Sequence, residues 1–169
     1  MNNDIKRIKN KIKDFGITAN DVIPISDIRD FERSNQISLP EELIGFYSEI
    51  GNGCTMIDGF LLKSLEELLF DKRAAEEFIF TEYWIWEAEE EDNYELLSAV
   101  EKGHIELINI GDSQSWNIIV SGKEKGQMWF FSDVGIQPCC PKRSFLSWFE
   151  YWLDGNEDYF KDFVYIANG

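Results

Sequence analysis

The amino-acid sequence predicts an α+β fold, with a mainly antiparallel sheet of about five or six strands and flanking helices at both chain ends. Three observations lead to this class. Apolar residues recur at steps of three and four within the first 50 residues, they alternate with polar residues between positions 104 and 131, and helical spacing returns from position 144. Helices, then a run of strands, then helices is the element order of an α+β domain, whereas a parallel sheet needs strands that alternate with helices.

The first third of the chain predicts three helices. Residues 4–15 carry isoleucines at steps of three and four, and Gly16 follows as a stop signal. A short capped helix is expected at 26–32. A third helix is expected at 39–50, because Pro40 suits a first helical turn and acidic residues follow it, where the helix dipole favours them.

Beyond the third helix, the spacing of the apolar residues no longer follows the helical repeat throughout. We expect a strand at 56–62, a capped helical turn at 64–70, a strand at 104–110 and a hairpin over 116–131. A helix is expected at 144–153, where aromatic side chains share one face.

The remaining segments have weaker patterns. In the middle stretch, residues 72–80 and 94–100 are expected to be helical and residues 81–86 extended. A last helix is expected at 158–166.

One domain is expected over residues 1–169, with an acidic insertion at about 71–104, because no linker or repeat divides the chain. The net charge is −16, and residues 71–112 hold 13 acidic and 3 basic side chains, which is −10 of that total. Such a surface repels nucleic acid and anionic membranes. A basic protein partner is therefore favoured.

The sequence contains no recognisable catalytic or metal-binding constellation. His104 is the only histidine, and three cysteines without C-x-x-C spacing are typical of a reducing compartment. No signal peptide and no membrane-spanning run is found. We therefore expect a cytoplasmic protein that is not an enzyme and uses no cofactor and no metal.

The acidic run of the middle stretch is the best candidate for a binding surface. Aromatic residues flank its carboxylates, which is the composition of a protein-binding hot spot. The candidate partner-binding residues are Trp84, Trp86, Glu87, Glu89, Glu90, Glu91, Asp92 and Tyr94. A solvated acidic face, a metal site and simple packing of the aromatic rings onto the sheet are the alternatives.

Several short motifs, taken in order, resemble those of the SUKH superfamily, which includes bacterial immunity proteins and fungal cell-wall-synthesis regulators. The similarity covers roughly residues 25–153. Its pieces are Leu39-Pro40-Glu41-Glu42-Leu43-Ile44-Gly45-Phe46-Tyr47, Gly51-Asn52-Gly53, Gly59-Phe60-Leu61-Leu62 with Ser64-Leu65-Glu66-Glu67-Leu68, Ile108-Asn109-Ile110-Gly111-Asp112, the 116–131 hairpin with Gly126, and Ser144-Phe145-x-x-Trp148-Phe149.

The resemblance implies an α+β fold, no catalysis and, for bacterial members, neutralisation of a cognate toxin, often a nuclease, in the cytoplasm of the producing cell. A regulatory interaction module of the fungal type is the alternative, and an enzyme is a distant third. The motif residues are expected to be scaffold: Leu39, Pro40, Phe46, Tyr47, Asn52, Gly53, Gly59, Gly111, Trp129 and Phe145.

The chain also departs from the family pattern. Residues 113–116 stand where many members have glycines, and the acidic stretch is longer than a minimal member needs. The toxin and the oligomeric state, monomer or weak dimer, therefore stay open.

Overall fold

A five-stranded antiparallel sheet organises the protein, with the strand order β3-β7-β6-β5-β4. The computed structural model describes residues 1–86 and 94–161. The strands of this sheet are β3 (Trp84–Ile85), β4 (His104–Gly111), β5 (Gln114–Ile119), β6 (Met128–Phe131) and β7 (Gly135–Pro138). A smaller antiparallel sheet pairs β1 (Cys54–Thr55) with β2 (Leu61–Leu62).

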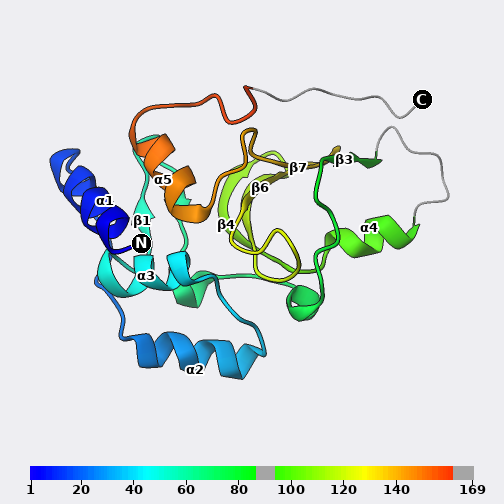
Figure 1. The fold of residues 1–169 in the computed structure, drawn as a ribbon, viewed down its shortest axis with the longest axis horizontal. Helices are drawn as coiled ribbons and strands as arrows, with labels where there is room; N and C mark the ends of the chain where they lie inside the picture. The colour runs from blue at the N-terminus through cyan, green and yellow to red at the C-terminus, as the bar shows by residue number, and fades with distance from the viewer. Residues whose placement is uncertain (87–93, 162–169) are drawn as a thin grey trace.

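Helices lie at both chain ends, as the sequence predicts. They are α1 (Asn2–Asp14), α2 (Ile25–Asn35), α3 (Glu41–Glu49), α4 (Tyr94–Val100) and α5 (Phe145–Leu153), and two 3₁₀ turns, η1 (Leu65–Glu67) and η2 (Lys72–Ala75), complete the described elements. The first three helices gather at one end of the molecule and α4 lies at the other, with the large sheet between them (Figure 1). The predicted α+β class is confirmed.

The large sheet has an apolar core on each face. Side chains alternate across a strand, so the neighbouring residues Ile118 and Ile119 of β5 enter different cores. The first core contains Ile118 together with the buried sides of α1, α3 and α5. The second contains Ile119 with Trp129 of β6 and Ile136 of β7, and it is closed by residues from the acidic middle stretch.

The middle stretch thus covers one face of the sheet. Phe78, Phe80, Trp84 and Ala99 are all buried in the second core. The backbone of the middle stretch comes very near the backbone that follows β5 at Gly122, which forms a parallel bridge with Phe78. A Cβ at this glycine would lie 2.4 Å from the carbonyl oxygen of Phe78. The expected insertion is therefore packed onto the sheet and also supplies its edge strand, β3.

Two of the expected elements differ in the structure. The single strand expected at 56–62 is a turn followed by the two-residue strand β2, because Gly59 adopts a φ of +87° and its N–H donates to the carbonyl oxygen of Met56 at 2.8 Å. The helix expected at 72–80 is confined to η2, since Phe78 and Phe80 enter the core at the two-residue spacing of extended chain.

Two further elements were also missed or misplaced. Strand β7 has no sequence prediction. Residues 158–161 are not helical, and the rest of the helix expected at 158–166 lies outside the described residues.

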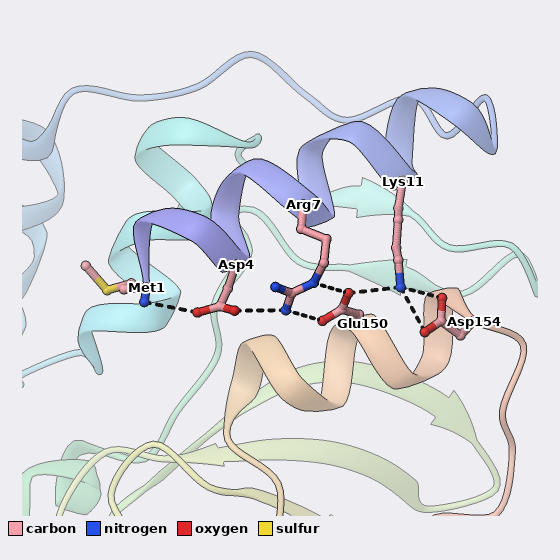
Figure 2. Close-up of polar contacts among 6 residues, drawn as sticks. All are labelled: Met1, Asp4, Arg7, Lys11, Glu150 and Asp154. Atoms are coloured by element: carbon pink, nitrogen blue, oxygen red, sulfur yellow. Dashed lines mark hydrogen bonds and ion pairs between the residues drawn. The ribbon is translucent and has the colours of Figure 1, made fainter.

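Ion pairs join the N-terminal helix to the last described helix (Figure 2). The Arg7 guanidinium on α1 donates two hydrogen bonds of 2.6 Å to the Glu150 carboxylate on α5. The Lys11 ammonium lies 2.9 Å from the same carboxylate and 2.6 Å from that of Asp154. Asp4 lies between the amino group of Met1 and Arg7, at 3.0 and 2.8 Å. These contacts fix α1 across α5 above the first core.

The Arg7 and Lys11 contacts lower the pKa of the Glu150 carboxyl to about 2, from 4.5. A carboxyl with a depressed pKa in the folded state stabilises the fold above the pKa of the unfolded chain and loses that effect as the pH falls. We expect Glu150→Gln to cost about 1–2 kcal/mol at pH 7, because Arg7 is half exposed and solvent screens the pair. The difference from wild type should shrink between pH 4.5 and pH 2.

Urea unfolding at pH 7, 4 and 2.5 measures this difference. Glu49→Gln is the matched control, since the Glu49 carboxylate makes no ion pair within residues 1–86 and 94–161. A Glu150→Gln penalty that stays constant down to pH 2.5 contradicts the prediction.

Candidate functional site

The motif residues of the third helix are packing residues. Leu39, Phe46 and Tyr47 are buried, and the Phe46 ring contacts the rings of Phe145 and Phe149 on α5, with centroids 5.4 and 4.9 Å apart. Pro40 is the N-cap of α3 rather than a residue of its first turn. These side chains join α3 to α5 and leave no reactive group at the surface.

Asn52 and Gly53 connect the end of α3 to η1. The Asn52 side chain accepts a hydrogen bond from the Leu65 N–H at 2.8 Å and donates one to the Glu66 carboxylate at 2.9 Å, which lowers the pKa of that carboxyl. Gly53 has a φ of +84°, and a Cβ there would lie 2.6 Å from the Leu62 carbonyl oxygen. Both residues therefore have structural roles, since Asn52 binds a backbone N–H group and Gly53 allows two backbone segments to lie close together.

The other motif positions have similar surroundings. Trp129 and Phe145 have no exposed surface, and both Gly59, in the β1–β2 turn, and Gly111, the last residue of β4, have positive φ angles.

The single histidine and two of the three cysteines are buried or nearly so, and burial shifts their pKa values. Burial lowers the pKa of His104, whose Nδ1 lies 2.9 Å from the Asn117 side-chain oxygen. Burial also raises the pKa of the Cys54 and Cys139 thiols to about 12, so neither is a thiolate at neutral pH. The part of the chain that the structure describes has no cluster of three possible metal ligands.

The residues predicted to bind a partner have different environments. Trp84 is only 8% exposed, and its ring stacks on Phe80 with centroids 5.5 Å apart. Trp86 is half-buried and its indole N–H donates to the Asp133 carbonyl oxygen at 2.7 Å. Tyr94, the first residue of α4, is 76% exposed. The acidic positions Glu87, Glu89, Glu90, Glu91 and Asp92 lie outside the described residues.

Two further exposed apolar side chains accompany Tyr94, one lining a cavity with it and one three residues further along α4. Ile79 and Leu97 are about half exposed, and a cavity of about 620 Å³ is lined by Ile79, Tyr94 and Glu95 among others. The Glu95 carboxylate makes no ion pair with any described residue. We call Ile79, Tyr94, Glu95 and Leu97 the α4 surface. Sequence reasoning missed Ile79 and Leu97, although apolar residues on a helix beside an acidic run were the available signal.

A second cavity, of about 510 Å³, lies on the other side of the molecule's sheet, against the first core. It is bounded by the β1–β2 turn, by β4 and β5, by α5 and by the segment after α5. Its walls include Met56, Ile57, Phe60, Trp148, Trp152 and Tyr159. The sequence does not predict this cavity, because its walls come from segments about 90 residues apart.

Comparison of the chain with family models, with curated proteins and with solved structures finds no match. Among the described residues, no helix is both long enough and apolar enough to cross a membrane.

Proposed function

We propose that this protein is a non-catalytic binding protein that recognises a basic protein domain through the α4 surface and the acidic run before it. One observation carries the proposal: exposed apolar side chains, with Tyr94 the most exposed, lie in the quarter of the chain that holds −10 of the net charge. Apolar anchors surrounded by charge are typical of interfaces in which a few residues dominate the affinity.

The resemblance to the SUKH superfamily specifies the partner within this proposal. The partner is a bacterial toxin domain, such as a nuclease, and the chain covers its active or substrate-binding surface in the cytoplasm. Nuclease surfaces that grip phosphate are basic, so an acidic protein is attracted to them, and opposite charge raises the association rate. The high pKa values of the buried Cys54 and Cys139 thiols, which keep these two groups protonated at neutral pH, are consistent with a role without catalysis by either thiol.

The test uses the toxin domain encoded next to this gene, with rates measured by surface plasmon resonance at low and high salt. Tyr94→Ala should increase the dissociation rate by about 30-fold, because a desolvated aromatic anchor is worth about 2 kcal/mol. Phe15→Ala, just after α1 and 54% exposed, is the matched control and should dissociate like wild type.

Charge reversal tests whether the acidic residues set the association rate, separately from the effect of Tyr94 on the dissociation rate. Replacing Glu89, Glu90 and Glu91 by lysine should slow association and flatten its salt dependence, whereas the single reversal Glu49→Lys on α3 should change little. If the Tyr94→Ala and triple-lysine variants stay folded and bind like wild type, the α4 surface is not the interface. If no basic protein domain encoded by a neighbouring gene binds this protein, the proposed function itself is wrong.

A further inference from the structure

The cavity beside the β1–β2 turn, which we call the aromatic cavity, has the size of a ligand site. Its volume, about 510 Å³, falls in the range typical of pockets that hold small molecules. Aromatic side chains from the β1–β2 turn, from β5, from α5 and from the segment after α5 line it: Phe60, Trp116, Trp148, Trp152 and Tyr159. Phe60 is 38% exposed, so part of its ring is open to a ligand.

Two carboxylates also belong to the described lining, which contains no lysine, arginine or histidine. They are Asp58 and Glu157, both exposed, and neither makes an ion pair with a residue of 1–86 or 94–161. The Asp58 carboxylate has a fixed position, since one oxygen accepts the Phe60 N–H at 3.2 Å and the other accepts the Trp152 indole N–H at 2.9 Å. A negative charge is therefore held beside two of the aromatic residues.

This arrangement favours a cation over an uncharged ligand or an anion. The faces of aromatic rings are the negative part of their quadrupole and attract cations. The carboxylates of Asp58 and Glu157 add a Coulomb attraction, and the net charge of −16 raises the local concentration of cations. An uncharged ligand gains none of these three contributions, and an anion is repelled by the carboxylates.

The apolar part of the lining decides which cation fits. A hard metal ion needs a shell of oxygen ligands, which the aromatic and isoleucine walls do not offer. A primary ammonium brings three N–H donors, and losing their water without new acceptors is costly. Alkyl groups on the nitrogen remove these donors and contact apolar walls such as Ile57 and Ile108 instead.

We propose that the aromatic cavity binds a small organic cation with an alkylated ammonium group. Asp58 and Glu157 attract the charge, while Phe60 and Trp152 contact the alkyl groups beside Asp58. No residue of the α4 surface lines this cavity, and the site does not depend on the proposed partner.

Three small molecules with the same two-carbon alcohol chain test the charge and the alkyl groups separately. Choline carries a trimethylammonium group, 3,3-dimethylbutan-1-ol has carbon in place of the nitrogen, and ethanolamine lacks the methyl groups. Each is titrated at pH 7 and constant ionic strength while the Trp152 indole N–H resonance is followed by NMR. Choline should bind saturably and about tenfold or more tightly than the other two. Equal or tighter binding by either of them, or no saturable shift with choline, overturns the proposal.

A trimethylated lysine of a protein would present the same chemical group. A pentapeptide with one trimethylated lysine at its centre separates this source from a free small molecule. The peptide should bind more weakly than choline, because an extended chain loses more conformational entropy on binding. Tighter binding by the peptide overturns the assignment to a small molecule.

Two substitutions, each with a matched control, place the cation. Asp58→Asn keeps an acceptor oxygen for Trp152 and removes the charge, so it should weaken choline about 5- to 10-fold and leave the uncharged alcohol unchanged. Asp27→Asn, at an exposed position on α2, should leave choline unchanged. Phe60→Leu should weaken choline about 2- to 5-fold, whereas Phe15→Leu should not. Equal effects of a substitution and its control contradict this site.

Discussion

Phe46→Ala is expected to lower the free energy of unfolding by about 3–5 kcal/mol, the cost of removing a fully buried aromatic ring and leaving a cavity. The Phe46 ring has no exposed surface and lies against Phe145 and Phe149, so neither α3 nor α5 can refill the space without moving. Urea unfolding followed by circular dichroism measures the change.

Phe15→Ala provides the control for Phe46→Ala, since the Phe15 ring at the end of α1 is 54% exposed and its removal should cost less than about 0.5 kcal/mol. A Phe46→Ala variant that keeps wild-type stability while losing partner binding would show that Phe46 belongs to the interface and not to the scaffold.

Gly122→Ala is expected to detach the middle stretch from the sheet and to cost about 2–5 kcal/mol. Gly122 has a φ of +88°, where an alanine is strained by about 1–2 kcal/mol. Its Cβ would also lie 2.4 Å from the Phe78 carbonyl oxygen, and relieving such an overlap adds about 1–3 kcal/mol.

Gly111→Ala separates these two contributions. Gly111 has the same φ of +88°, and a Cβ there meets nothing within 4 Å, so its substitution should cost only the backbone strain. Hydrogen exchange locates the damage: in Gly122→Ala the amides of α4 and β3 should exchange faster, while those of α1 and α3 keep their protection. Equal stability losses in the two variants would contradict the close contact at Gly122.

The packing of the middle stretch bears on the proposed interface. Phe78 and Phe80 are buried on either side of Ile79, and Ala99 packs α4, which carries Tyr94, into the same second core. A preorganised anchor loses less conformational entropy on binding than a loose one. A substitution at Gly122 should therefore weaken partner binding as well as stability.

Local pattern was enough to predict most helices and the α+β class. The isoleucines of α1 meet on one stripe because three- and four-residue steps share a helix face, and Ile5, Ile8 and Ile12 are indeed buried. The β5–β6 hairpin could be predicted equally well, since its turn glycines and its alternating apolar and polar residues lie within 20 residues of one another. Such features depend on neighbours in the chain, which the sequence displays directly.

Burial in the middle stretch depended on contacts distant in sequence. Trp84 and Tyr94 both flank the same acidic run, yet Trp84 lies in the second core and Tyr94 is exposed, because only the former meets the sheet. Strand β7 and the extended backbone around Phe78 form by pairing with β6 and Gly122, and the aromatic cavity joins the β1–β2 turn to α5. The sequence by itself determined the periodicity of the elements and their order, whereas the tertiary structure decided which face each aromatic side chain occupies, because burial is set by the segments that pack together and not by local spacing.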